Sequence, residues 1–282
     1  MKVSVISPVK NEVEFIGQSI MAVLPHVHEI LYGIAPSDDG TEELLRHIQQ
    51  KYAGEKLRLF WGDSNGEPIW DFNPSNMETY DRSYNYLIEQ ATGDAVWFLH
   101  PDMIVTNPEQ IAKLAEGPLA WWTQITSYAR DLNTKITAGR SDRWKNIHAK
   151  KFGLHYFGAY GSQNEDFYHR DITGNSYRHY GADFEEYPFD VAASGIAVNH
   201  YCELKDFARR LEKMKRCLKT LHPQATDAQI DEMARLHPRV TLDAKETRFG
   251  KFEFTQTSED VPDVFKHYGD EFKAFNKRLQ AA

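Results

Sequence analysis

The stretch AVWFLHPDMIV, residues 95–105, decides how the rest of the chain is interpreted. It begins with five apolar residues, as a buried β-strand does, and then reaches His100, Pro101 and Asp102. A turn explains this ending, because proline and aspartate are frequent in turns. A metal site explains it as well, because imidazole and carboxylate groups both bind metal ions. The remainder of the chain is needed to choose between these two interpretations.

Strand-like and helix-like segments alternate through the N-terminal part of the chain. Apolar, β-branched runs predict strands at residues 2–9, 29–35, 56–62 and 94–99. Apolar residues at helical spacing predict helices at residues 12–27, 41–53 and 77–92. This alternation indicates a doubly wound, mostly parallel sheet, whose ligands bind at the carboxyl ends of the strands. We therefore expect residues 8–11, 37–40 and 100–102, which each follow a strand, to line one edge.

The second half of the chain is less regular. Strands are predicted at residues 119–129 and 190–201, and the segment 130–190 between them is aromatic, polar and expected to be irregular. Helices are predicted at residues 203–221, 226–236 and 261–279. Thr226 and Gln229 have the spacing of a capping box at the start of the second of these helices.

Length and composition set the class of protein. A chain of 282 residues, 41% of them hydrophobic, suits one α/β domain with an appended helical region. The formal net charge of −8 argues against a protein that coats nucleic acid through its overall field.

Cysteine usage and the N-terminus predict the compartment. Cys202 and Cys217 form neither a disulfide framework nor a zinc-binding spacing. The N-terminus lacks a secretory signal, and no apolar run approaches the ~20 residues of a transmembrane helix. We therefore expect a cytoplasmic protein without a transmembrane segment.

Three motifs occur in an order typical of one enzyme family. They are VSVISPVKNEVEFI at residues 3–16, SDDGTEELL at residues 37–45, and RSYNYLIEQATGDAVWFLHPDMIV at residues 82–105. Together they resemble the nucleotide-sugar-binding half of family 2 glycosyltransferases with the GT-A fold, over roughly residues 1–115. The resemblance implies a Rossmann-like α/β fold with a mixed, mostly parallel central sheet, flanking helices and a helical C-terminal extension. It implies a catalytic domain at residues 1–202, with nucleotide-sugar and acceptor halves at 1–115 and 116–202, and an extension at 203–282.

The resemblance also implies a metal site. In the family, the fourth strand ends in an Asp-x-Asp motif whose last aspartate binds a divalent cation, and here the matching triplet is His100-Pro101-Asp102. Asp102 is then expected to bind Mn²⁺ or Mg²⁺, and His200, in GIAVNHYCELKDFARRL, to complete the site. A turn aspartate and a histidine that only hydrogen-bonds beside a helix start are the alternatives. His100 departs from the family pattern, and it could bind the metal, orient a neighbour, contact the sugar or only pack.

Nucleotide contacts follow from the same resemblance. The first strand-to-helix loop is expected to wrap the base and ribose through Ser7, Pro8, Val9, Asn11 and Glu12. Ile34 stands where the family has a base-reading aspartate, so either Asp38 or Asp39 takes over this role or the base is held differently. Asp39 could equally be a turn residue before a helix. Arg82, on the helix before the metal strand, either faces the diphosphate or is a solvated helix residue.

The resemblance implies an inverting enzyme, with a retaining course as the alternative. An inverting enzyme of this family needs a carboxylate that deprotonates the acceptor hydroxyl. Asp166, paired with Glu165, is the preferred candidate because this Glu-Asp pair follows a glycine-containing loop, as in the family. Asp183, Glu185 and Glu186 are the other candidates, and all of these carboxylates could also be ordinary surface charges.

The function implied is transfer of a sugar from a nucleoside-diphosphate sugar, UDP-linked, to an acceptor hydroxyl. The acceptor is a glycan, lipid or protein, or a modified base in DNA. The locally basic stretch at residues 130–151 could attract an anionic acceptor, such as a phosphorylated glycan, a lipid headgroup or nucleic acid, or it could be a solvated loop. Two rivals are a non-catalytic nucleotide-sugar-binding module on a degenerate GT-A scaffold and a nucleotidyltransferase. The nucleotidyltransferase ranks last, because the loop after the first strand lacks the expected glycines. The sequence leaves the oligomeric state open.

Overall fold

The main sheet of the protein begins with four parallel strands. A computed structural model describes residues 1–62, 77–129, 131–137, 143–150, 154–158, 165–170, 176–179, 191–205, 207–222, 224–241, 246–247, 250–251, 253–256 and 261–280. The parallel strands are β1 (Val3–Val9), β2 (Glu29–Ile34), β3 (Leu57–Phe60) and β4 (Ala95–Phe98). They lie in the order β4-β1-β2-β3, with β1 hydrogen-bonded on both sides. The strands predicted in this half of the chain are confirmed.

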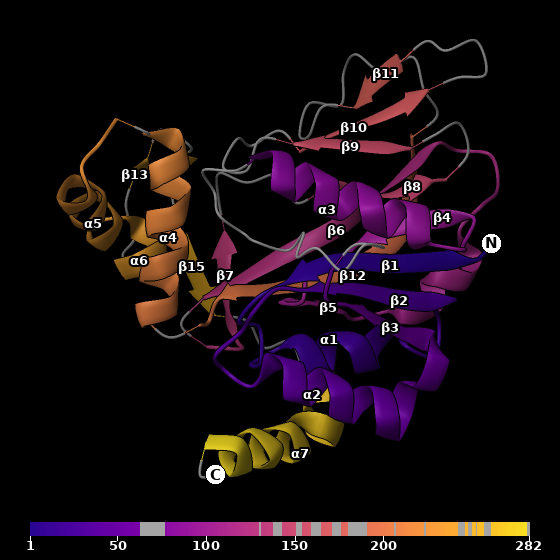
Figure 1. Ribbon diagram of the computed structural model, residues 1–282, viewed down its shortest axis with the longest axis horizontal. Helices are drawn as coiled ribbons and strands as arrows, with labels where there is room; N and C mark the ends of the chain where they lie inside the picture. The colour runs from indigo at the N-terminus through magenta and orange to yellow at the C-terminus, as the bar shows by residue number, and fades with distance from the viewer. Residues whose placement is uncertain are drawn as a thin grey trace.

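The other half of the main sheet is mixed. Strand β8 (Arg143–Ala149) pairs antiparallel with β4 and with β6 (Ala120–Ala129). The long strand β12 (Val191–Glu203) runs parallel to β6 and antiparallel to the short β5 (Met103–Val105). Strands β7 (Thr134–Thr137) and β15 (Glu253–Gln256) extend the sheet to ten strands within the described residues. The expected mixed sheet with parallel strands at its N-terminal side is therefore present (Figure 1).

The expectation that residues 130–190 are irregular is wrong for several segments. Besides β7 and β8, this region holds β9 (His155–Gly158), β10 (Glu165–Arg170) and β11 (Ser176–His179), which form a separate antiparallel sheet. The sequence of β10, EDFYHR, does not alternate apolar and polar residues. It is a strand because it pairs with β9 and β11. Such pairing between distant segments leaves no alternating pattern in the sequence of β10. A further two-stranded sheet joins β13 (Glu246–Thr247) to β14 (Gly250–Lys251).

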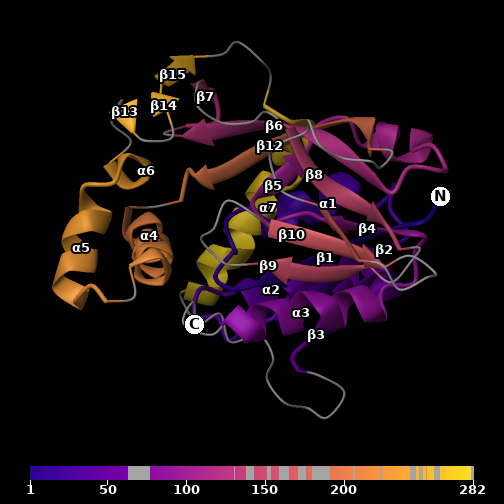
Figure 2. The ribbon, with the colours of Figure 1, turned by 90° about the horizontal axis from the view of Figure 1, so that it is seen from above.

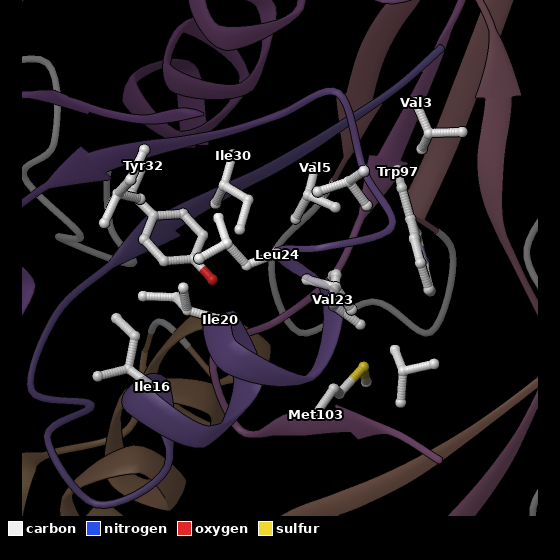
Figure 3. Close-up of a cluster of buried hydrophobic side chains, with 14 of the residues drawn as sticks. Val3, Val5, Ile16, Ile20, Val23, Leu24, Ile30, Tyr32, Trp97 and Met103 are labelled. Carbon is white, nitrogen blue, oxygen red and sulfur yellow. The ribbon is translucent and has the colours of Figure 1, made fainter. Parts of the chain in front are cut away.

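Helices cover both faces of the parallel strands (Figure 1). Helices α1 (Ile16–Val23) and α2 (Thr41–Ile48) lie on one face and α3 (Met77–Gln90) on the other. Successive side chains of a strand point to opposite faces, so Val5 packs toward α1 while Ile6 packs toward α3. Figure 3 shows Ile16, Ile20 and Val23 of α1 directed at the strand residues. Burial on both faces explains why these strands read as continuous apolar runs.

Three short helical segments complete this part of the chain. They are the π-helix η1 (Gln49–Ala53) and the 3-10 helices η2 (Gly54–Lys56) and η3 (Pro108–Lys113). None of the helices in the described ranges is both long and apolar enough to cross a lipid bilayer.

The helical C-terminal extension divides into two parts. Helices α4 (Phe207–Leu221), α5 (Asp227–Arg235) and α6 (Pro238–Thr241) stand beside the sheet and pack around their own small core (Figure 2). The capping box predicted at Thr226 and Gln229 is present at the start of α5. Helix α7 (Asp263–Gln280) returns to the N-terminal half and packs against α1 and α2. The domain boundary at residue 203 stays a prediction.

The contact between α7 and α1 depends on a glycine. Phe272 of α7 is 2% exposed and lies so close to Gly17 that a Cβ atom there would be 2.5 Å from the phenyl ring. Glu271 adds polar contacts: its carboxylate accepts hydrogen bonds from Lys51 Nζ at 2.8 Å and from Tyr52 Oη at 2.5 Å. These contacts hold α7 against α1 and η1.

Glu29 ties together the amino ends of the parallel strands. Its buried carboxylate accepts hydrogen bonds from Ser4 Oγ at 2.8 Å, from Thr92 N at 2.6 Å and from Arg58 at 2.9 Å. Burial by itself raises the pKa of Glu29, but the hydrogen bonds from Thr92, Arg58 and Ser4 outweigh it and lower the pKa to about 2. This network lies at the edge of the sheet opposite to the carboxyl ends of the strands.

We predict that Glu29→Gln lowers the free energy of unfolding by about 1–3 kcal/mol at pH 7, because it removes a charged acceptor from buried donors. The folded pKa is about 2 and the ordinary value 4.5, so this stabilisation is complete above about pH 4.5 and is lost as the pH falls toward 2. Urea unfolding of both proteins at pH 7 and pH 3 measures it. A difference between the proteins that does not shrink at pH 3 contradicts the assignment.

We predict that Phe272→Ala lowers the free energy of unfolding by about 3–5 kcal/mol, the cost of emptying a buried phenylalanine site. Phe207, which is 47% exposed at the start of α4, provides a matched control. Phe207→Ala is expected to cost less than about 1 kcal/mol. Equal losses for the two variants in denaturant unfolding would show that α7 is not docked on α1.

Candidate functional site

Three loops meet at the carboxyl edge of the parallel strands. The loop after β1 contacts the loop after β2, because Asn11 N donates to Ser37 Oγ at 3.1 Å and Glu12 N donates to Thr41 Oγ1 at 2.8 Å. The loop after β4 is linked to the loop after β1 through Lys205, which lies near both Glu12 and Asp102. The structure therefore brings together the three segments that the strand order predicted to share one edge.

Asp102 is held in a tight turn between β4 and β5. Met103 N donates to the His100 carbonyl at 3.0 Å, which closes the turn, and Tyr201 N donates to the Asp102 carbonyl at 2.9 Å. The pairing of β12 with β5 places His200 opposite Met103. As a result, His200 Nε2 lies 3.5 Å from Asp102 Oδ1, with only 12% of the histidine side chain and 2% of the aspartate side chain exposed.

Aromatic rings pack around Tyr201, the residue that follows His200. Tyr201 stacks on Phe15 with ring centroids 5.5 Å apart and meets Phe265 of α7 edge-on, also at 5.5 Å. Tyr128 of β6 lies 5.1 Å from the same ring. The end of β12 is thereby packed against Phe15 before α1, Tyr128 of β6 and Phe265 of α7. These contacts restrain the backbone next to His200.

Lys205 is a site residue that the sequence reading missed. Its Nζ lies 2.6 Å from each carboxylate oxygen of Glu12 and 3.3 Å from Asp102 Oδ2. The lysine side chain is 5% exposed, and a buried ammonium group needs carboxylate partners to offset the loss of hydration. Its position in the sequence could have indicated a site residue. Lys205 lies five residues after the predicted metal ligand His200, in the turn between a strand and a helix.

The side chains at Asp102 suit a divalent cation bound jointly with a substrate. No group of three or more His, Cys, Asp or Glu side chains converges on one point in the described parts of the chain. A closed metal cage is therefore not built there. One carboxylate oxygen facing one imidazole nitrogen at 3.5 Å fits Mn²⁺ or Mg²⁺, because these ions take their remaining ligands from phosphate oxygens and water.

The loop after β1, which the resemblance assigns to the nucleotide, has a defined backbone shape. Ser7, Pro8 and Val9 are buried within β1, and Ser7 Oγ donates to the Pro8 carbonyl at 3.0 Å. Asn11 has a left-handed backbone, with φ of 55°, and its side-chain oxygen accepts a hydrogen bond from Asp38 N at 3.1 Å. The side chain of Ile34 is 2% exposed and belongs to the hydrophobic core.

Asp39 joins the two loops. Its carboxylate accepts hydrogen bonds from Val13 N at 3.1 Å and from Thr41 N at 2.9 Å, and Arg209 NH1 lies 3.3 Å from it. These contacts occupy a side chain that is 4% exposed, at the start of α2 where a carboxylate also suits the helix dipole. Asp38, by contrast, is exposed. Asp38 is thus the member of this pair whose carboxylate is accessible to a ligand.

The remaining predicted residues lie at varied depths. His100 is partly buried in the turn before Asp102, and Arg82 is exposed on α3. Glu165 and Asp166 begin β10, where their backbones pair with Gly158 and Phe157 of β9. The alternative bases Asp183, Glu185 and Glu186 lie outside the described residues.

We predict that Asp39→Ala lowers the free energy of unfolding by about 1–3 kcal/mol, because two buried backbone donors and Arg209 lose their acceptor. Its neighbour supplies the control, since the exposed Asp38 changed to alanine is expected to shift stability by at most about 0.5 kcal/mol. Thermal and urea unfolding of the two single variants measures the difference. Equal stability of both variants would contradict the role given to Asp39.

Solved structures that match this chain share little sequence with it and have TM-scores below 0.5. S. aureus TarS 1–349 is 11% identical with a TM-score of 0.38, and the match covers 86% of this chain and 71% of that chain. Glucosyl-3-phosphoglycerate synthase from Mycobacterium tuberculosis, in complex with Mn²⁺, UDP and phosphoglyceric acid, is 15% identical with a TM-score of 0.40, covering 79% and 78%. The same enzyme with Mn²⁺, UDP and glucosyl-3-phosphoglycerate is 12% identical with a TM-score of 0.40, covering 93% and 90%. A search of curated proteins gives no match.

The family assignment comes from the sequence match. A family model described as "Glycosyl transferase family 2" matches residues 4–165, which is more than half of the chain. The matched range contains the loop after β1, the loop after β2 and the turn that carries Asp102. It confirms the family expected from the motifs: the chain belongs to glycosyl transferase family 2.

Proposed function

We propose that this protein is a metal-dependent, inverting glycosyltransferase that uses a nucleoside-diphosphate sugar, UDP-linked, as its donor. The observation that carries the proposal is the approach of Asp102 Oδ1 to His200 Nε2, 3.5 Å apart and nearly buried, at the edge where the nucleotide loops meet. Membership of the family supplies the reaction type. A bound Mn²⁺ or Mg²⁺ would act as a Lewis acid that neutralises the leaving diphosphate.

The proposed roles of the surrounding residues follow from their positions. Asp102 and His200 hold the cation, and the backbone of residues 7–12 holds the base and ribose. Asp38, whose side chain is exposed, takes the base contact that Ile34 does not provide. The exposed guanidinium of Arg82 approaches the diphosphate oxygens when the donor is bound.

The acceptor is activated by a carboxylate of β10. Asp166 is the proposed general base and removes the proton of the acceptor hydroxyl as that oxygen attacks the anomeric carbon. Glu165 is its partner at the start of the same strand. The acceptor is a glycan, lipid or protein hydroxyl, and a modified base in DNA is the variant that a salt-dependent shift assay on duplex DNA would reveal.

A non-catalytic nucleotide-sugar-binding protein is the second candidate. Two positions favour it: His100 stands where the family has the first aspartate of its metal motif, and Ile34 is buried where the family has an aspartate that reads the base. Calorimetric binding of a sugar nucleotide without turnover across a panel of donors and acceptors would favour this candidate over the enzyme.

We predict that Asp102→Ala lowers sugar transfer or donor hydrolysis in the presence of Mn²⁺ by more than about 100-fold, since even residues outside the first coordination sphere typically account for about 10–100-fold. The measurement is the release of UDP from UDP-sugars. Asp227→Ala is the control, because the Asp227 side chain is 96% exposed on α5. Unchanged activity of the Asp102 variant would overturn the metal assignment.

A further inference from the structure

Lys205 occupies one oxygen of the proposed metal-binding aspartate. Its Nζ lies 3.3 Å from Asp102 Oδ2, whereas His200 lies beside the other oxygen, Oδ1. The carboxylate therefore faces a permanent protein cation on one side and the proposed metal position on the other. The lysine comes from the turn after β12, and both oxygens of Glu12 hold it in place at 2.6 Å.

Lys205 reduces the attraction of Asp102 for a free metal ion. Glu12 and Asp102 carry one negative charge each, and Lys205 cancels one of them. A ligating imidazole is neutral, so His200 adds no charge. The nearby Arg209 faces its own carboxylates, Glu14 at 3.5 Å and Asp39 at 3.3 Å. Among these described side chains, four carboxylates face two cations, so two net negative charges remain, but the carboxylate of Asp102 is itself beside an ammonium group.

A nucleoside diphosphate changes this balance. Its phosphate oxygens bring negative charges and metal ligands together, and the same ammonium group that repels a free cation attracts them. We propose that Lys205 is a positioning residue that makes metal binding at Asp102 and His200 conditional on the donor diphosphate. This inference rests on the proposed function and adds an order to it: the cation enters with the nucleotide or after it.

A purely structural ion pair is the competing explanation, and it predicts a different outcome. If Lys205 only stabilised the fold, its replacement would weaken the site for every ligand. If it sets the charge of the site, its replacement raises the affinity for a divalent cation and lowers the affinity for an anionic nucleotide. Removing the ammonium leaves two adjacent buried carboxylates, which bind a divalent cation more tightly and an anionic nucleotide more weakly.

The test is to measure ligand binding to the full chain without turnover. Free Mn²⁺ is quantified by electron paramagnetic resonance, with and without UDP, and calorimetry measures UDP and inorganic diphosphate in the absence of metal. For Lys205→Met we expect Mn²⁺ alone to bind about tenfold tighter, and UDP and diphosphate alone about tenfold weaker, than for the unmodified protein. The increase in Mn²⁺ affinity caused by UDP is expected to shrink.

Three further variants make the result specific. Lys205→Arg keeps the charge and is expected to keep the unmodified pattern of affinities. Lys215→Met removes a lysine of α4 that pairs with Glu212 and Asp231, and it is expected to leave both affinities unchanged. Glu12→Gln removes one negative charge and is expected to weaken Mn²⁺ alone by about tenfold, which tests the charge balance even if Lys205→Met does not fold.

The outcomes separate the inference from the proposed function. If the unmodified protein binds neither Mn²⁺ nor UDP nor diphosphate, the proposed function itself is overturned. If the unmodified protein binds them and Lys205→Met weakens both the cation and the nucleotide, or changes neither, only the role of Lys205 is overturned. Tighter Mn²⁺ together with weaker nucleotide supports it.

Discussion

The parallel pairing of β1 with β2 on one side and β4 on the other is the constraint on which the rest of the molecule depends. Because all three strands run in the same direction, the chain leaves each of them at the same edge of the sheet. Segments distant in sequence, near Glu12, Asp39 and Asp102, are thereby delivered to one place. The strands themselves are buried on both faces, so the edge is a rigid base for polar side chains.

The charged side chains at this edge are mostly buried and contact one another. Asp39 joins the loops after β1 and β2, and Lys205 joins the loops after β1 and β4. Charged side chains this deeply buried are costly unless they are paired, so such a concentration of them points to a purpose beyond stability. In the function proposed above, that purpose is to bind the leaving diphosphate together with a divalent cation.

Sequence patterns predicted the elements whose residues are patterned locally along the chain. They failed for the strands that form only because distant segments pair with one another. The strands of the N-terminal half were predictable because burial on both faces leaves continuous apolar runs. The start of α5 was predictable because Thr226 and Gln229 are only three residues apart in the chain. Strands β9 to β11 carry no such pattern. In the site, motif order pointed to Asp102 and His200, but Lys205 joins Glu12 through a fold contact that spans much of the chain and that no spacing encodes.

The docking of α7 links the core to the candidate site. Phe272 fills the space above Gly17, and Phe265 of the same helix packs on Tyr201, the residue after His200. One helix therefore covers the outer face of α1 and also packs against the strand end that carries His200. Loosening of α7 removes both contacts together, so the stability of the core and the integrity of the candidate site depend on the same helix.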